Sequence, residues 1–235
     1  MNARDRLIVA LDVPSAEAAR ALVDLLVGRV GLFKVGSQLF TAAGPGFVQE
    51  IIGRGEKVFL DLKYHDIPNT VAGAVGSASR LGVSLVDIHG LGGRAMLEAA
   101  VGALPAMKTR LLAITILTSH DEMSLGQIGV NGSVHDSVRR LALLAKDAGL
   151  DGVVTSPHEV AVIREACGTD FLIVTPGIRP AGAATGDQAR AATPATALAA
   201  GADYLVVGRP ITAAEDPRGA TDAILREMES ALDTA

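Results

Sequence analysis

The chain has 235 residues, of which 49% are hydrophobic and 20% are charged, so it can form a large buried core and is not globally disordered. A formal net charge of −5 and an aromatic fraction of 3% argue against a nucleic-acid-binding surface. The N-terminal residues contain no apolar segment followed by a small-residue cleavage site, so we expect no secretory signal. The longest run without charged residues, 35–49, is too short to span a membrane. We therefore expect a soluble cytoplasmic protein without membrane or nucleic-acid partners, in which the single cysteine, Cys167, is a small buried residue.

Short apolar runs recur along the chain, each followed by a turn and then by a segment with helical periodicity. Most runs are almost continuously hydrophobic, which is typical of strands in a parallel sheet that helices cover. The eight predicted strands are Leu7–Leu11, Leu32–Val35, Lys57–Leu62, Ser84–Ile88, Leu111–Leu117, Gly152–Thr155, Phe171–Thr175 and Tyr204–Val207.

The segments between these runs are amphipathic and rich in alanine. Ser15 stands where a helix N-cap is expected, Pro157 suits a first helical turn, and Gly82 and Gly149 are typical helix stops. The predicted helices are Ser15–Val27, Asn69–Leu81, Ser133–Ala148, Pro157–Ala166, Thr193–Ala200 and Pro217–Leu232.

The spacing of the strands indicates the fold class. Successive strands start roughly one strand–helix unit apart, about 30 residues, which leaves no room for a second domain. Eight units predict an α/β fold, a single (β/α)8 TIM barrel domain over residues 1–235. A doubly wound sheet is the alternative, although no glycine-rich dinucleotide-binding pattern follows any strand. Two long loops, Thr118–Gly132 and Gly177–Arg190, are candidate lids; for the first, a tolerated insertion is equally compatible with the sequence.

Polar residues gather where the predicted strands end. A TIM barrel carries its active site at the carboxyl ends of its strands. Charged side chains at the ends of hydrophobic strands cost desolvation free energy unless they are paired, so their recurrence on successive strands indicates a site. The residues are Asp12, Lys34, Asp61, Lys63, Asp66, His89, Thr118, Ser119, Arg179 and Arg209.

Asp61 and Lys63 are two positions apart and are therefore expected on the same side of one strand, about 6.6 Å apart along it. A lysine between carboxylates keeps its proton, so Lys63 suits a proton donor better than a Schiff-base nucleophile. The alternative is an ion-pair network that only stabilises the barrel, and a single Asp–Lys pair would favour this structural interpretation. The combination of Lys34, Asp61, Lys63 and Asp66 favours a catalytic site.

The glycines and arginines near the last two strands indicate a phosphate site. Loops after strands seven and eight frequently bind phosphate in this fold. Gly177 and Gly208 can expose backbone N–H groups, and Arg209 adds a bidentate donor. The histidines lack metal-ligand spacing, so no metal site is expected.

The segment from Asp61 to Thr70, Asp-Leu-Lys-Tyr-His-Asp-Ile-Pro-Asn-Thr, closely resembles the signature of orotidine 5′-phosphate decarboxylases. Further similar segments occur in family order and extend the resemblance over essentially the whole chain. They are Ala10–Pro14, Phe33–Gly36, Leu117–Ser119, Thr175–Pro180, Asp187–Gln188 and Val207–Pro210.

The resemblance implies a homodimeric TIM barrel of pyrimidine biosynthesis that converts the nucleotide orotidine 5′-phosphate to UMP and CO₂ without metal or organic cofactor. By this resemblance, Lys34, Asp61 and Lys63 form a charged array that Asp66 of the other subunit completes, and Lys63 gives the proton to C6. The resemblance also assigns the remaining substrate contacts: Asp12 and Lys34 to the ribose, Ile67 and Thr70 across the dimer interface, Thr118 and Ser119 to the pyrimidine, and Arg179, Gln188, Gly208 and Arg209 to the phosphate.

Two other functions remain open. A metal-dependent sugar-phosphate lyase or synthase on a related barrel shares the Asp-x-Lys-x-x-Asp pattern, but it needs an acidic residue on strand two, where this chain has Lys34. A non-catalytic nucleotide-binding barrel would keep the phosphate site and lose the charged array, all of which is present here.

Overall fold

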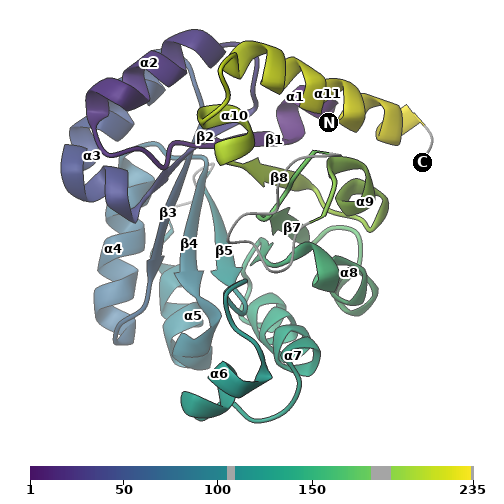
Figure 1. The fold of residues 1–235 in the computed structure, drawn as a ribbon. Helices are drawn as coiled ribbons and strands as arrows, with labels where there is room; N and C mark the ends of the chain where they lie inside the picture. Colours follow the sequence, from purple (N-terminus) through teal and green to yellow (C-terminus); the bar gives the residue numbers. More distant parts are fainter. Residues whose placement is uncertain (105–108, 181–191, 234–235) are drawn as a thin grey trace.

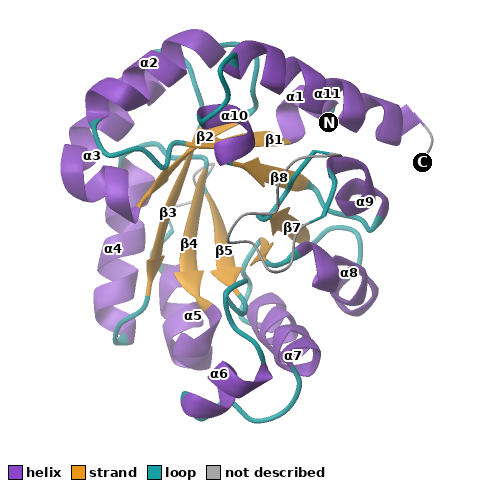
Figure 2. Cartoon of the chain, viewed as in Figure 1, coloured by secondary structure: helices purple, strands orange, loops and turns teal. Residues whose placement is uncertain are grey.

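The computed structural model describes residues 1–104, 109–180 and 192–233. Parallel strands close a barrel in the order β1-β2-β3-β4-β5-β6-β7-β8, and helices surround it (Figures 1 and 2). This arrangement confirms the predicted (β/α)8 TIM barrel. The strands are β1 Leu7–Ala10, β2 Leu32–Gly36, β3 Val58–Tyr64, β4 Leu85–His89, β5 Arg110–Ile114, β6 Gly152–Val154, β7 Leu172–Thr175 and β8 Tyr204–Val207.

The predicted helices all form, within a residue or two at most ends. Ser15, Ser133 and Thr193 each cap a helix by accepting a hydrogen bond from the backbone N–H three residues later. The α-helices are α1 Ala3–Arg6, α2 Ala16–Leu26, α3 Ser37–Gly53, α4 Pro68–Arg80, α5 Gly93–Gly102, α6 Glu122–Gln127, α7 Val134–Asp147, α8 Val160–Cys167, α9 Pro194–Ala199, α10 Arg209–Thr212 and α11 Pro217–Asp233; the 3₁₀ turns are η1 Gly90–Gly92 and η2 Pro157–Glu159.

Several helices have no clear sequence signal. Helix α3 contains Pro45 and a kink at Gly44, whose φ of 70° lies in the left-handed region, and this break interrupts the apolar periodicity. Helix α6 lies inside the long loop Thr118–Gly132, where Asp121 and Ser124 form a capping box. That loop therefore has structure of its own. Most of the second long loop, Gly177–Arg190, lies outside the described residues.

The fifth strand is shorter than predicted. Strand β5 ends at Ile114, and the last bond to β6 runs from the Thr115 N–H to the Val154 carbonyl, 3.1 Å away. Beyond this point the chain leaves the barrel wall. Ile116 is apolar because it lines the cavity described below and not because it continues the strand, which is why its hydrophobicity misled the prediction.

Alternate strand residues fill the barrel interior, and the other residues pack under the helices. Leu32, Phe59 and Leu85 belong to the interior cluster on β2, β3 and β4. The residues two positions later on the same strands point to the same interior, nearer the carboxyl ends of the strands. They are Lys34, Asp61 and Asp87, and all three are buried. Charge therefore replaces apolar packing in the upper part of the barrel.

Cys167 is buried, as predicted, and burial raises the pKa of its thiol. Among the helices in the described ranges, none is both long and apolar enough to cross a membrane.

Candidate active site

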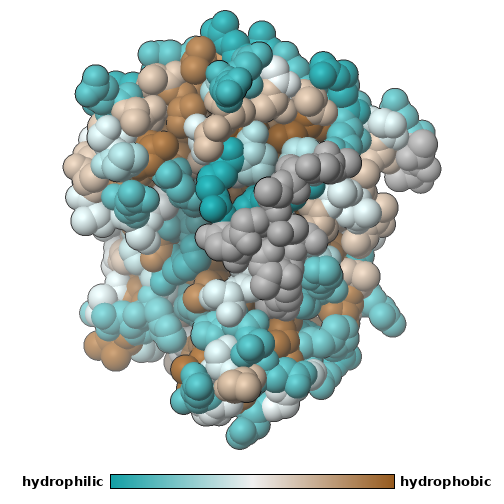
Figure 3. Space-filling view, in the orientation of Figure 1, coloured by the Kyte–Doolittle hydropathy of each residue, from teal (hydrophilic) through white to brown (hydrophobic). Residues whose placement is uncertain are grey.

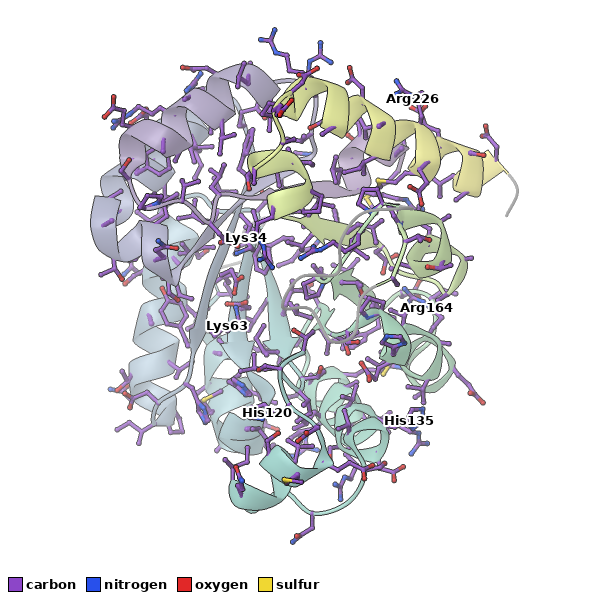
Figure 4. The ribbon with its side chains drawn as sticks, viewed as in Figure 1. Lys34, Lys63, His120, His135, Arg164 and Arg226 are labelled. Carbon is purple, nitrogen blue, oxygen red and sulfur yellow. The ribbon has the colours of Figure 1, made fainter. Side chains whose placement is uncertain are left out.

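A cavity of about 490 Å³ opens at the carboxyl ends of the strands. Hydrophilic atoms gather near the centre of the face shown in Figure 3, and in Figure 4 the side chains of Lys34 and Lys63 point toward the middle of the barrel. Most of the residues predicted for the site line this one cavity. They are Asp12, Lys34, Asp61, Lys63, Thr118, Arg179, Gly208 and Arg209.

Three strands supply a continuous chain of alternating charges. Lys34 Nζ on β2 lies 3.0 Å from Oδ1 of Asp12, which follows β1, and 3.1 Å from Oδ2 of Asp61 on β3. The other carboxylate oxygen of Asp61 contacts Nζ of Lys63. The Asp61 carboxylate thus bridges two lysines, and its orientation is fixed from both sides.

Burial makes these pairs strong. The side chains of Lys34 and Asp61 are each only 10% exposed. Burial alone would raise the pKa of Asp61, but Lys34, Asp87 and Lys63 together hold it below the usual value. Burial likewise opposes the charge on Lys34, and Asp61 and Asp12 overcome this effect and raise the pKa of the amine. Asp61 is therefore an anion and Lys34 a cation at neutral pH.

Lys63 is held in an unusual backbone conformation. Among the residues that the structure describes, it is the only one other than glycine with a left-handed φ, 52°. The register between β3 and β4 shifts between Leu60 and Tyr64, which marks an irregularity of the β-bulge kind at this point. The Lys63 N–H donates to Oδ1 of Asp87 on β4 at 2.8 Å. The regular strand spacing assumed from the sequence is therefore broken at Lys63.

The opposite side of the cavity is rich in positive charge. Arg179 follows β7, and Arg209 follows β8 at the start of α10. Burial, and then the nearby Arg209 guanidinium, lower the pKa of Arg179. Two guanidinium groups that repel each other line the cavity together with Gly177 and Gly208, and this arrangement suits a doubly charged anion.

Comparison with known proteins identifies the family. A sequence model described as "Orotidine 5′-phosphate decarboxylase / HUMPS family" matches residues 5–224. The chain belongs to this family. It is 58% identical over 228 residues to an orotidine 5′-phosphate decarboxylase of Halorhodospira halophila, covering 96% of this chain and 97% of the relative. It is 54% identical over 237 residues to that of Moorella thermoacetica, covering 97% and 94%.

Solved structures agree with this assignment to the decarboxylase family. A crystal structure of orotidine 5′-phosphate decarboxylase from Lactobacillus acidophilus matches with a TM-score of 0.83 and 39% identity, over 94% of this chain and 98% of that chain. A conserved protein from Geobacillus kaustophilus, described as uncharacterized, gives the same TM-score and identity over 94% and 99% of the two chains.

Some of the residues that family resemblance assigns to the site lie outside this cavity. Asp66 is exposed on the loop after β3, and its Oδ1 accepts a hydrogen bond from the Ile67 N–H at 2.6 Å. Ile67 and Thr70 are also exposed, and Ser119 lies beyond the cavity lining that includes Thr118. Gln188 lies outside the described residues.

The sequence analysis named His89 at the end of its strand, but it missed Asp87 and the stacking of His65 on His89. Asp87 is fully buried within β4, and its only signal was a single acidic residue inside an apolar run. His89 and His65 stack with ring centroids 5.2 Å apart beside the charged array. Burial, and then the charges of His65, Lys63 and His120, lower the pKa of His89 to about 4. Among the described residues, no group of His, Cys, Asp and Glu side chains is arranged to hold a metal ion.

Proposed function

We propose that this chain is a carboxy-lyase that converts orotidine 5′-phosphate to UMP and CO₂ in pyrimidine biosynthesis. The observation that carries this proposal is the cavity itself, in which an alternating lysine–aspartate array faces a pair of arginines. Relatives that are 51–58% identical over nearly their full length bear the name of this activity. The strands that close the barrel run from residue 7 to residue 207, which supports a single domain over residues 1–235.

Lys63 is the proton donor in this proposal. Loss of CO₂ leaves an electron pair in an sp² orbital at C6 of the pyrimidine, where no conjugated system accepts it. An ammonium group fixed beside C6 stabilises this developing charge and then gives it a proton. The contact between Lys63 and Asp61, together with the bond from the Lys63 N–H to Asp87, supports such a fixed position.

One lysine does not account for the full rate enhancement. Two unit charges about 4 Å apart interact by roughly 4 kcal/mol at an effective dielectric constant near 20. Enzymes typically lower barriers by about 8–23 kcal/mol. The remainder comes from binding energy at the phosphate and ribose, which holds the base against the preorganised array.

The other cavity residues hold the parts of the nucleotide that do not react. Asp12 and Lys34 contact the ribose hydroxyls, and Thr118 with Ser119 contacts the edge of the pyrimidine. Arg179, Gly208 and Arg209 hold the phosphate together with Gln188. The mutual repulsion of Arg179 and Arg209 supports this assignment because a bound phosphate dianion relieves it.

The enzyme acts as a homodimer with shared active sites, in which Asp66 enters the array of the partner subunit. Two observations support this arrangement: Asp66 does not reach the array of its own chain, and large apolar side chains are exposed in the loop after β3 and in α6, the helix that follows β5. Ile67, after β3, is 68% exposed, and Met123, after β5, is 76% exposed. Such a protein suits the cytoplasm, where its soluble nucleotide substrate would be made.

Complementation between two variants tests the shared site. Lys63→Ala and Asp66→Ala are each expected to be inactive as homodimers. When the two are mixed and allowed to exchange subunits, half of the dimers are mixed and each has one intact site, so about one quarter of wild-type activity returns. If the mixture stays inactive although subunits have exchanged, the shared site is wrong.

A direct assay tests the activity and separates it from the alternatives. Purified protein is incubated with orotidine 5′-phosphate, with and without EDTA, and the loss of the orotate absorbance is followed. We expect turnover that EDTA does not affect. Turnover that requires a divalent ion would favour the sugar-phosphate lyase class, and binding without turnover would favour a non-catalytic nucleotide-binding barrel.

A further inference from the structure

The fully buried carboxyl group of Asp87 lies next to Asp61 of the charged array. It sits two residues after Leu85 on β4 and points into the barrel, where the equivalent position on β5 in the register is Leu112. The side chain is 0% exposed. Burying a carboxyl group inside an apolar barrel is costly unless the group makes compensating interactions, so its presence calls for a role.

The Asp87 side chain makes a hydrogen bond to the main chain of the proposed proton donor. Oδ1 of Asp87 accepts from the Lys63 N–H at 2.8 Å, and Oδ2 is buried without a hydrogen-bond partner of normal length among the described residues. In a regular strand the Lys63 N–H would face a backbone carbonyl of the neighbouring strand. Here the register between β3 and β4 is broken around Lys63, so the Asp87 side chain takes the place of the lost ladder bond.

The conformation that this bond holds is unfavourable by itself. Lys63 has a φ of 52°, and a residue with a β-carbon stays in the left-handed region only where its surroundings fix it. A local irregularity of this kind re-aims a side chain, and the Lys63 amine contacts Asp61 in the cavity. We propose that Asp87 is a positioning residue, which fixes the left-handed backbone of Lys63 and thereby aims its amine at the reacting carbon; this inference rests on the proposed decarboxylase function.

This role requires an acceptor oxygen on Asp87 and not a negative charge. Burial, and then the Asp61 carboxylate, raise the pKa of Asp87 well above its usual value, while Asp87 in turn helps to lower that of Asp61. Burial and the neighbouring carboxylate therefore both oppose a negative charge on Asp87. Asparagine keeps the acceptor oxygen and carries no charge.

Two substitutions separate the acceptor from the bulk of the side chain. Asp87→Asn keeps an oxygen for the Lys63 N–H, and we expect kcat to stay within about threefold of the wild-type value because the geometry is unchanged. Asp87→Leu has a similar size and no acceptor. We expect it to lower kcat on the order of 100-fold, the effect of a displacement of about 1 Å of a catalytic group, with UMP affinity nearly unchanged.

Asp151→Leu is the matched control. Asp151 also accepts a hydrogen bond from a strand N–H, that of Leu111 at 2.7 Å, but it lies just before β6 at the opposite end of the barrel. We expect this variant to lose stability while kcat stays near the wild-type value. Asp87→Ala provides a second acceptor-free variant in case Asp87→Leu does not fold.

Hydrogen exchange of the Lys63 amide, measured by NMR, tests the geometry independently of activity. We expect slow exchange in the wild type and in Asp87→Asn, and fast exchange in the folded acceptor-free variant. Three results would each overturn the proposal. The folded acceptor-free variant could keep a kcat within threefold of the wild-type value, or it could keep a slowly exchanging Lys63 amide. The third such result is an Asp87→Asn variant whose kcat is as low as that of the acceptor-free variant. An inactive wild-type chain with the expected exchange pattern would instead refute the decarboxylase function and leave the structural part of the inference standing.

Discussion

Replacing Arg209 with alanine should weaken the binding of phosphorylated ligands far more than that of the nucleoside. Arg209 is exposed at the mouth of the cavity, and Arg179 stays in place beside it. A hydrogen bond to a charged group contributes about 1.5–3 kcal/mol. Because Arg209 is exposed and Arg179 remains to hold the phosphate, we take a net loss of about 2 kcal/mol, which corresponds to roughly a 30-fold weaker affinity.

Isothermal titration calorimetry with UMP and uridine measures this difference. Arg209→Ala is expected to lower UMP affinity about 30-fold and to change uridine affinity less than about twofold, because only UMP carries the phosphate. Arg226→Ala is the matched control, since Arg226 is exposed on α11 and points away from the barrel (Figure 4). Equal losses for the nucleotide and the nucleoside would refute the assignment of the phosphate site.

Two further predictions concern stability and assembly. The pKa of His89 is about 4 in the folded protein and near 6.5 in the unfolded chain. Between these two pH values the unfolded chain therefore carries a proton on His89 that the folded protein lacks. The free energy of unfolding should fall by about 2 kcal/mol between pH 7 and pH 5, and urea unfolding should show this loss in the wild type and not in His89→Gln. A pH dependence unchanged by the substitution would contradict the low pKa. If the protein forms the proposed dimer, Ile67→Glu should shift it to a monomer in analytical ultracentrifugation, because a charge would enter the apolar surface. An unchanged dimer would place the interface elsewhere.

The sequence was sufficient to predict the barrel because its strands are buried on both faces. Such strands appear as continuous apolar runs, and turn residues separate them from amphipathic helices. The prediction failed where apolar residues serve another purpose. Ile116 lines the cavity, so the fifth run continued past the true end of β5 at Ile114, and Gly44 with Pro45 obscured helix α3.

The position of the cavity that holds the candidate site could also be predicted, because the carboxyl ends of the strands must meet at one end of a barrel. The internal geometry of the site could not. Strand periodicity places Asp61 and Lys63 on one side, but it contains no information on the left-handed backbone at Lys63. Asp87 was overlooked because a single acidic residue in an apolar run gives no sign of which backbone amide it will meet.

The kcat of Lys63→Ala, measured together with its affinity for UMP, tests the proposed chemistry most directly. Loss of an ammonium about 4 Å from the developing charge removes roughly 4 kcal/mol of stabilisation, so kcat should fall at least about 1,000-fold while UMP still binds. Lys57 directly precedes β3, at the end of the barrel opposite the cavity, so Lys57→Ala should retain full activity and serves as the control. A Lys63→Ala enzyme that turns over orotidine 5′-phosphate within tenfold of the wild-type rate would contradict the role of Lys63 as the proton donor.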